Sequence, residues 1–230
     1  MKILGIDSSA KSASVAVIDN DKILSEFFIN TGHTHSQTLM PMINDALKCA
    51  NISVNDIDLF AVNKGPGSFT GIRIGIATVK GMADVCKKPC IGISTLEAMS
   101  YNLLCTDCIA CCVMDARCKQ VYCALFEIHD GNIDRLTEDS AISIQELQNI
   151  LKKYEKNKIF VGDGAELCYN ELSDKLSNVY IAPENIRYQR ASGVCLVARG
   201  KDSFVEAEEL VPEYLRLSQA ERELNAKKNN

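Results

Sequence analysis

The sequence predicts an α/β protein of two lobes, each a mixed sheet flanked by helices. Three observations favour this class. Three segments of strand length, with apolar or alternating patterns, open the chain at residues 2–7, 13–19 and 22–29. Helical and strand patterns then alternate to about residue 104. From residue 108 the second half opens again on strand-like segments and repeats this order more loosely, which suggests an old duplication.

In the first half, Asp19-Asn20-Asp21 predicts a hairpin turn between the second and third strands. After it we expect a helix over about 36–50, a strand over 57–63, a helix from near Gly71 to about residue 86, a strand over 91–93, and a helix over 95–104. The β-β-β-α-β-α order with an initial hairpin is the layout of one lobe of the actin-like ATPase (ASKHA, RNase H-like) fold.

The second half predicts strands at 108–115, 121–128, 132–136 and 158–162, and helices at 143–154, near 166–176 and at 191–200. The predicted domains are an N-terminal actin-like lobe over 1–104 and a C-terminal lobe of related but reduced topology over 105–218. The remaining segment, 219–230, is highly polar, and we expect it to be disordered.

Composition excludes several classes of protein. The 230-residue chain is 47% apolar, 24% charged and carries a net charge of −5, so bulk electrostatics do not favour nucleic acid. No stretch reaches the roughly 18 to 20 apolar residues of a membrane span. Asp7 interrupts the N-terminal apolar run early, so no signal peptide and a cytoplasmic location are expected.

Eleven cysteines are expected to be reduced thiols in such a location. Cys105, Cys108, Cys111 and Cys112 have spacing that resembles the start of an iron–sulfur motif. However, Ile109–Met114 has the pattern of a buried strand, whose side chains alternate between two faces and cannot all converge on one cluster. We therefore predict no metal site, with a metal site as the alternative interpretation.

A glycine-rich loop, Gly65-Pro-Gly-Ser-Phe-Thr-Gly71, lies between a predicted strand and a predicted helix. Ser68 or Thr70 can cap that helix. The loop could form a nest of N–H groups suited to an anion, or a tight turn that lets the helix pack closely on the sheet. It matches neither a P-loop, because Ile72 and Arg73 follow Gly71, nor the dinucleotide fingerprint.

An acidic residue followed by hydroxyls, Asp7-Ser8-Ser9, ends the first predicted strand. Actin-like ATPases have an acid and a phosphate-cradling turn here, but this turn has no glycine. We expect a vestigial anion or nucleotide site and no catalytic residue. The residues assigned to this site are Asp7, Ser8, Ser9, Gly65, Gly67, Ser68, Thr70 and Gly71.

The two helices of the first half carry more apolar surface than an ordinary surface helix, whose apolar stripe spans about 100°. One explanation is that the first helix covers the second. The other is a docking face for another subunit, to which we assign Leu39, Met40, Ile43, Leu47, Ile72, Ile76, Val79 and Ala83.

The string Gly65-Pro-Gly-Ser-Phe-Thr-Gly-Ile-Arg-Ile-Gly75 closely resembles the signature of the bacterial TsaB (YeaZ) family. Other stretches resemble further landmarks of the family, and together they span nearly the whole chain: 1–9, 35–43, 93–98, 115–117, 120–122 and 212–216. Members of this family are subunits of the machinery that makes N6-threonylcarbamoyladenosine (t6A) in tRNA.

The resemblance implies a non-catalytic subunit that forms a heterodimer with the catalytic paralogue TsaD through the helix pair. It also implies a homodimer when that partner is absent, a TsaE-like ATPase as a further partner, and tRNA contact only through the complex. We expect no bound cofactor here, with ATP used at partner subunits. TsaD holds its metal with a His-x-x-x-His motif, whereas His33, His35 and His129 provide no such pair.

Two other functions remain as alternatives. The chain could be an actin-like ATPase or small-molecule kinase in its own right, with Asp7, Ser8 and the glycine-rich loop as its site. A peptidase related to this fold is the third interpretation, but no motif supports it beyond paralogy with metal-binding proteins.

Overall fold

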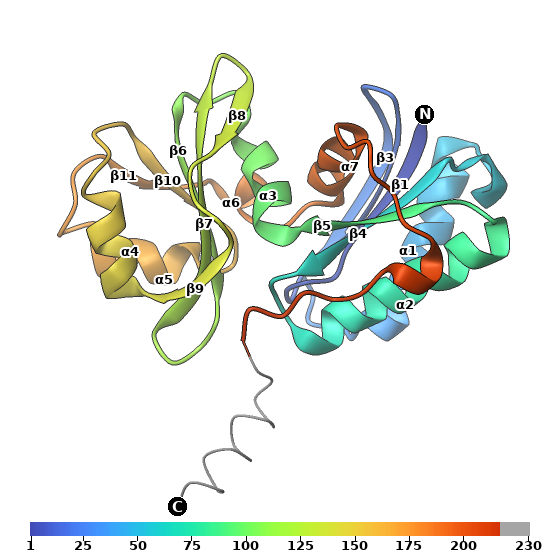
Figure 1. The fold of residues 1–230 in the computed structure, drawn as a ribbon, viewed down its shortest axis with the longest axis horizontal. Helices are drawn as coiled ribbons and strands as arrows, with labels where there is room; N and C mark the ends of the chain where they lie inside the picture. The colour runs from blue at the N-terminus through green and yellow to red at the C-terminus, as the bar shows by residue number, and fades with distance from the viewer. Residues whose placement is uncertain (217–230) are drawn as a thin grey trace, which may run out of the picture.

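Two separate sheets lie side by side in the computed structural model, which describes residues 1–216 (Figure 1). The first sheet has the strand order β3-β2-β1-β4-β5. Strands β1, β2 and β3 pair antiparallel, and β4 and β5 continue the sheet parallel to β1. Their bounds are β1 Lys2–Asp7, β2 Ala13–Asp19, β3 Lys22–Ile29, β4 Leu59–Gly65 and β5 Cys90–Ser94.

The second sheet repeats this plan. Its order is β11-β10-β6-β7-β8, and β9 also pairs with β7. Its central strand β6 again has an antiparallel hairpin partner on one side and a parallel strand on the other, so the predicted two-lobed actin-like fold is confirmed. The strands are β6 Cys108–Asp115, β7 Gln120–His129, β8 Asn132–Arg135, β9 Ser140–Ser143, β10 Lys158–Val161 and β11 Val179–Ile181.

Helices cover the sheets on both faces. On the first sheet, α1 (His35–Ala50) and α2 (Phe69–Cys86) cover one face, while α7 (Ala191–Arg199) packs on the other. On the second sheet, α4 (Ile144–Leu151) and α5 (Ala165–Leu172) cover one face. The opposite face packs against α3 (Thr95–Ser100), which lies between the lobes (Figure 1).

The position of α7 corrects the predicted domain division. Residues 191–200 were assigned to the second lobe, but α7 packs on β1 and β2 of the first. Val194 and Val197 join the apolar core beneath this face of the sheet, and Ser14 Oγ accepts a hydrogen bond from the Ala191 N–H at 3.0 Å. The face of the first sheet opposite α1 and α2 is apolar, and α7, which comes late in the chain, covers it.

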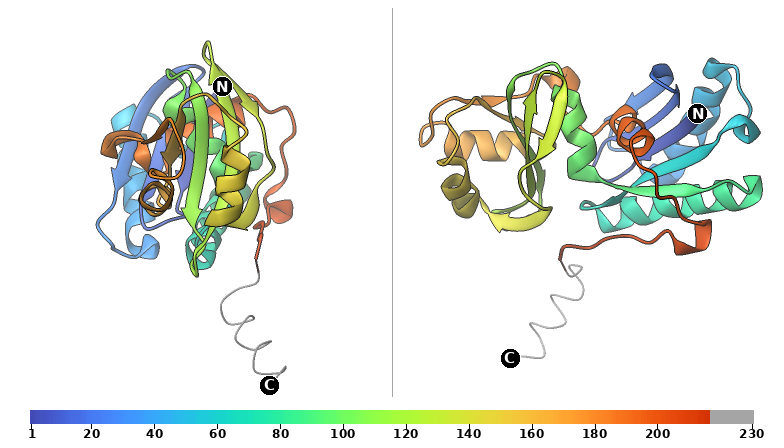
Figure 2. Two further views of the ribbon diagram at one scale, coloured as in Figure 1. Left: turned by 90° about the vertical axis from the view of Figure 1, so that its left-hand side faces the viewer. Right: turned by 45° about the horizontal axis from the view of Figure 1, so that its top comes forward.

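After α7 the chain stays with the first lobe and then crosses to the second. Residues 205–216, which we call the strap, run along α2 and end beside the second lobe (Figures 1 and 2). The strap includes a short 3-10 turn at Ala207–Glu209. The polar segment predicted to be disordered, 219–230, lies outside the described residues.

Other predictions from the sequence are partly incomplete and partly confirmed by the structure. Besides the 3-10 turns Val54–Asp56 and Ala207–Glu209, three elements were not predicted: the short strands β9 and β11 and the helix α6 (Glu184–Arg187). The strand predicted around the cysteines is confirmed, because Cys108, Cys111 and Cys112 are buried on β6 and contribute to two different cores. No helix within residues 1–216 is long and apolar enough to cross a membrane.

Candidate functional site

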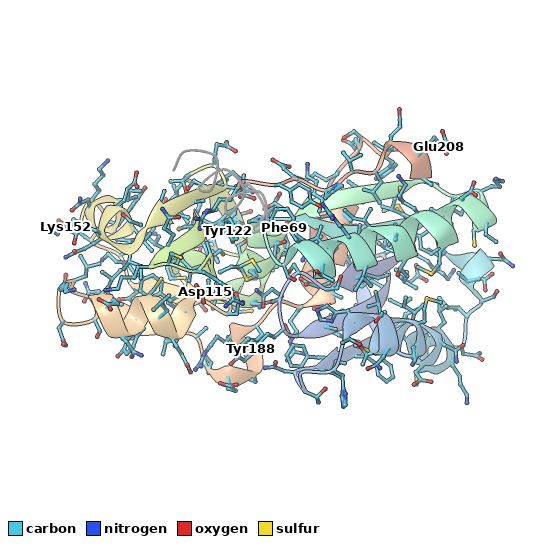
Figure 3. All side chains as sticks on the ribbon, turned by 90° about the horizontal axis from the view of Figure 1, so that it is seen from below. Phe69, Asp115, Tyr122, Lys152, Tyr188 and Glu208 are labelled. Atoms are coloured by element: carbon cyan, nitrogen blue, oxygen red, sulfur yellow. The ribbon has the colours of Figure 1, made fainter. Side chains whose placement is uncertain are left out.

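A cleft of about 520 Å³ lies between the lobes. The β1–β2 turn and the glycine-rich loop line it from the first lobe, and the β6–β7 turn and Asp163 line it from the second. Phe69 and Tyr122 approach each other across this cleft, with Asp115 nearby (Figure 3). The structure therefore brings together three segments that the sequence analysis singled out separately.

The glycine-rich loop packs directly on the β1–β2 turn. Ser68 is the N-cap of α2, and its Oγ accepts from the Gly71 N–H at 3.3 Å. The Ser68 N–H donates to the Ser9 carbonyl at 2.7 Å, and Ser8 Oγ donates to the Gly71 carbonyl at 2.8 Å. Two N–H groups of the proposed nest are thus bonded within the chain, which favours the tight-turn interpretation of this loop. Of the two predicted caps, Ser68 is confirmed.

Asp7 is buried beneath this turn and does not line the cleft. Its Oδ1 accepts from the Ser9 N–H at 2.9 Å and from Ser9 Oγ at 2.8 Å, and its Oδ2 accepts from Asn63 Nδ2. Burial raises the pKa of Asp7 to about 6, although the hydrogen bonds from Ser9, the charge of His35 and the bond from Asn63 act in the opposite direction. These hydrogen bonds join Asp7 to the β1–β2 turn and to β4.

The cleft itself holds the carboxyl groups of Asp115 and Asp163. Asp115 Oδ1 accepts from the Arg117 N–H at 2.7 Å, and Asp163 Oδ1 accepts from Gln189 Nε2 at 3.2 Å. Enclosure within the cleft raises the pKa of Asp163 to about 6, and the charges of Asp115 and Asp7 add to this effect. The bond from Gln189 opposes it. Asp163 therefore lines the cleft with a pKa close to neutrality.

The β6–β7 turn has an unusual backbone that the sequence analysis missed. Arg117, Cys118 and Lys119 have φ angles of 64°, 55° and 58°, so three consecutive residues with side chains are left-handed. This conformation costs roughly 1–2 kcal/mol per residue. Asp115 and Gln120 provide hydrogen bonds that define the turn. No glycine or asparagine marks it in the sequence, so no local signal could have revealed it.

The predicted docking residues lie mostly in the core, so that prediction is wrong for them. Six are buried between the helix pair and the first sheet, and Leu47 is partly buried against them: Leu39, Ile43, Ile72, Ile76, Val79 and Ala83. These side chains belong to the protein's own core, which α1, α2 and the first sheet share. Of the eight, only Met40 is exposed, at 53%.

A different set of side chains on the same helices faces outward. Val85 is 82% exposed, and Ala77 and Gly81 are exposed between it and the half-buried Ile74. These positions follow each other at helical spacing on the outer side of α2. A Cβ at Gly81 would meet nothing within 4 Å. Below, these four residues and the exposed Met40 of α1 are together named the outer face.

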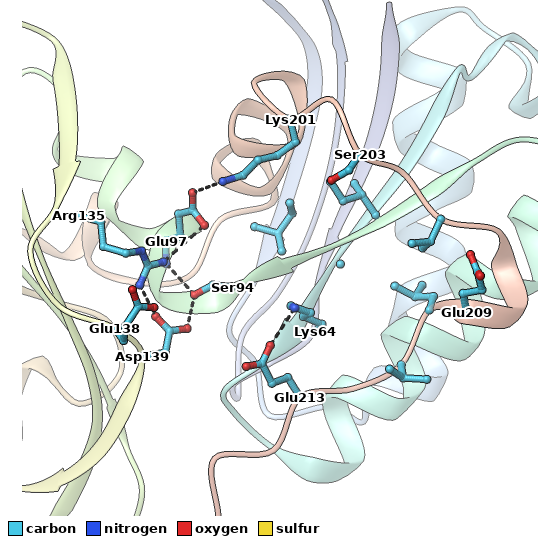
Figure 4. Close-up of a pocket in the computed structure, with 16 residues that line it drawn as sticks. Lys64, Ser94, Glu97, Arg135, Glu138, Asp139, Lys201, Ser203, Glu209 and Glu213 are labelled. Carbon is cyan, nitrogen blue, oxygen red and sulfur yellow. Dashed lines mark hydrogen bonds and ion pairs between the residues drawn. The ribbon is translucent and has the colours of Figure 1, made fainter.

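A second hollow of about 830 Å³ lies between β5, the strap and the second lobe (Figure 4). Arg135 pairs with Asp139 at 2.7 Å and with Glu97 at 3.5 Å, and Lys201 pairs with Glu97 at 2.8 Å. Ser94 Oγ donates to Asp139 Oδ2. This polar network joins β5, α3 and the end of α7 to the β8–β9 segment of the second lobe.

The histidines and acidic side chains do not assemble a metal site in the described part of the chain. Within residues 1–216, no three His, Cys, Asp or Glu side chains are placed to hold one ion. His35 Nε2 lies 2.8 Å from the Ala10 carbonyl, and His33 is exposed.

Comparison with known proteins decides the family. The family model described as TsaD, tRNA N6-adenosine threonylcarbamoyltransferase, matches residues 22–224. The tRNA threonylcarbamoyladenosine biosynthesis protein TsaB of Buchnera aphidicola is 32% identical over 80% of this chain and 89% of its own length. The chain belongs to the TsaB (YeaZ) family. TsaB of Bacillus subtilis is 28% identical over 96% of both chains.

A solved TsaB-family structure supports the fold. YeaZ from Pseudomonas aeruginosa superposes with a TM-score of 0.77 at 22% sequence identity, covering 93% of this chain and 99% of that one. The predicted TsaB resemblance is therefore confirmed at the level of both sequence and fold.

Proposed function

We propose that this protein is a TsaB-type subunit of t6A biosynthesis, which pairs with a TsaD-type threonylcarbamoyltransferase and leaves the transfer reaction to it. The observation that carries the proposal is the match along almost the whole chain to proteins named for tRNA threonylcarbamoyladenosine biosynthesis. The same residues also match the TsaD family model, so partner and subunit would be built on related folds. We place the protein in the cytoplasm, together with the tRNA that the complex modifies.

The geometry supports a non-catalytic role. The acid that ends β1 in actin-like ATPases is here Asp7, and both of its oxygens accept hydrogen bonds from Ser9 and Asn63. The glycine-rich loop donates Ser68 N–H to the chain's own carbonyl of Ser9. Groups that would otherwise hold a phosphate are engaged in holding a turn, so we assign ATP use to partner subunits.

The outer face of α1 and α2 is the surface we assign to the TsaD-type partner. Val85 and Met40 supply apolar area, and Gly81 and Ala77 allow a partner helix to approach closely. In the absence of that partner, the same face would join two copies of this chain through an isologous contact. A TsaE-like ATPase and tRNA would then meet the assembled complex.

The test is reconstitution with the TsaD-type protein of the same organism. Size-exclusion chromatography with light scattering should show a one-to-one complex, and Ala77→Glu on the outer face should abolish it. Tyr180→Glu, an exposed site on β11 of the second lobe, is the matched control and should pair normally. A complex that survives Ala77→Glu would remove the outer face from the interface.

One observation favours the alternative of an independent ATPase. Asp163 keeps a pKa of about 6 inside the cleft, and Asp115 lies beside it, as a general base would require. Nucleotide turnover by the isolated chain, lost in Asp163→Asn, would support that alternative. Absence of turnover together with a stable complex would support the subunit.

A further inference from the structure

The strap connects three parts of the molecule that are distant in sequence. At its start, Val205 and Cys90 of β5 exchange both backbone hydrogen bonds, each at 2.9 Å. Further along, Lys80 of α2 donates to the carbonyls of Glu208 and Leu210 at 3.1 and 3.3 Å. The Glu213 N–H then donates to the carbonyl of Lys64 at 2.8 Å, so the strap is bound to the first lobe along this length.

The end of the strap reaches the glycine-rich loop and the second lobe. The ring of Tyr214 stacks on Phe69 with centroids 4.2 Å apart and planes 10° from parallel. Its hydroxyl accepts from Arg73 Nε of α2 at 2.7 Å. Leu215 packs against the apolar core of the second lobe, and Arg216 Nη1 donates to the carbonyl of Ala116 at 2.7 Å.

The hydrogen bond from Arg216 to Ala116 lies next to a strained part of the backbone. Ala116 directly precedes the three left-handed residues of the β6–β7 turn, whose conformation is costly. Backbone strain of this kind persists only where the surrounding structure holds it. Arg216 supplies a bond from outside the turn, in addition to those from Asp115 and Gln120 within it. The turn also lines the cleft, so its conformation sets the shape of the cleft.

We propose that the strap is a clasp that joins helix α2 to the β6–β7 turn, and that it holds both the left-handed turn and the adjoining end of the cleft in place. Lys80, Arg73 and the stack of Tyr214 on Phe69 hold the strap on α2. Leu215 and Arg216 attach it to the second lobe. The clasp goes beyond the proposed function, because it operates in the isolated chain whether or not a partner binds.

Hydrogen–deuterium exchange of the full-length protein, followed by mass spectrometry, tests the clasp. Tyr214→Ala and Arg216→Gln should each accelerate exchange of peptides covering residues 115–120 by about tenfold or more, because local opening of the turn becomes easier. Exchange in β2, an inner strand of the first sheet, should not change. Val211→Ala is the matched control, since this strap residue is 62% exposed, and it should behave as the wild type.

Unchanged exchange over residues 115–120 in both variants would overturn the proposal. If Tyr214→Ala or Arg216→Gln also accelerates exchange in β2, the variant has weakened the fold as a whole. In that case the experiment is repeated with Tyr214→Phe. That change keeps the stack on Phe69 and removes only the hydroxyl that accepts from Arg73. Faster exchange confined to residues 115–120 and the strap would then support the clasp, and wild-type exchange there would refute it.

Discussion

The carboxyl group of Asp7, at the end of β1, accepts a hydrogen bond from the side-chain amide of Asn63 on the adjacent strand β4. Both side chains are buried. The Oδ1 atom of Asn63 has no hydrogen-bond partner within the described residues, although it is buried too. Burial makes ionisation of this carboxyl group costly, although three hydrogen bonds are donated to its oxygens.

This pair predicts a specific pH dependence of stability. Burial raises the pKa of Asp7 to about 6, whereas the unfolded chain has the ordinary value of 3.8. Between these values the folded state binds the extra proton, so stability from this group falls as pH rises from about 4 to about 6, by on the order of 3 kcal/mol, and stays low above pH 6. The side chain in Asp7→Asn cannot ionise. The free energy of unfolding of this variant, relative to that of the wild type, should therefore increase as the pH rises from about 4 to about 6.

Urea unfolding of both proteins at pH 4, 5, 6 and 7 measures this difference. The exposed Asp134 provides a control, because Asp134→Asn should show no comparable gain. A difference between Asp7→Asn and the wild type that stays constant from pH 4 to pH 7 would contradict the assignment of a buried, proton-binding Asp7.

Adjacent positions on α2 separate the core from the outer face. Ile76 is 5% exposed and packs in the first core, so Ile76→Glu buries an unpaired charge and should unfold the first lobe. Ala77 is exposed, so Ala77→Glu should leave the thermal unfolding midpoint within a few degrees of the wild type. Circular dichroism on heating compares the two. A folded, stable Ile76→Glu protein would show that α2 is not held on the sheet as described.

The contrast between Ile76 and Ala77 also shows where sequence reasoning stopped. Most strands and helices were predicted within a few residues, because apolar periodicity and turn residues such as Asp19-Asn20-Asp21 are local signals. The apolar excess on α2 was seen correctly, but periodicity cannot tell which of two apolar neighbours faces the sheet and which faces outward. Most side chains assigned to docking are instead buried where α1 and α2 pack on the first sheet.

The elements that were missed depend on distant partners. Strand β9 is short and is defined by pairing with β7, and β11 by pairing with β10. The placement of α7 on the first sheet follows from the apolar face that β1 and β2 leave uncovered. In the candidate site, Asp7, Ser8, Ser9 and the glycine-rich loop were predicted to lie together and do so, but the internal hydrogen bonds of Asp7 were beyond the sequence.

The polar network between the lobes should contribute measurable stability. Arg135 bonds to Asp139 and Glu97 and lies over the ring of Phe126, 4.7 Å from its centroid. Arg135→Ala removes partly buried ion pairs and the stacked guanidinium, so the free energy of unfolding should fall by about 1–2 kcal/mol. Lys152→Ala, at an exposed position in the second lobe, should have little effect. Equal urea midpoints for Arg135→Ala and the wild type would show that the network is energetically neutral.

Two glycines of α2 should respond to alanine in opposite directions. At Gly71 an added Cβ would lie 2.0 Å from the Ser8 carbonyl oxygen, so Gly71→Ala must push the glycine-rich loop away from the β1–β2 turn. Overpacking of this kind costs typically about 1–3 kcal/mol. At Gly81 a Cβ meets nothing within 4 Å, and alanine in an exposed helix interior stabilises by roughly 0.5–1 kcal/mol.

The variants Gly71→Ala and Gly81→Ala also separate effects on stability from effects on binding to the partner. Gly81→Ala should raise the free energy of unfolding in urea, yet weaken binding to the TsaD-type protein, because a partner helix can no longer approach the α2 backbone as closely. Gly71→Ala should lower stability, and its effect on pairing should follow only from the loss of folded protein. A Gly81→Ala protein that is both more stable and unchanged in partner affinity, measured by isothermal titration calorimetry, would show that the partner does not approach α2 at this residue.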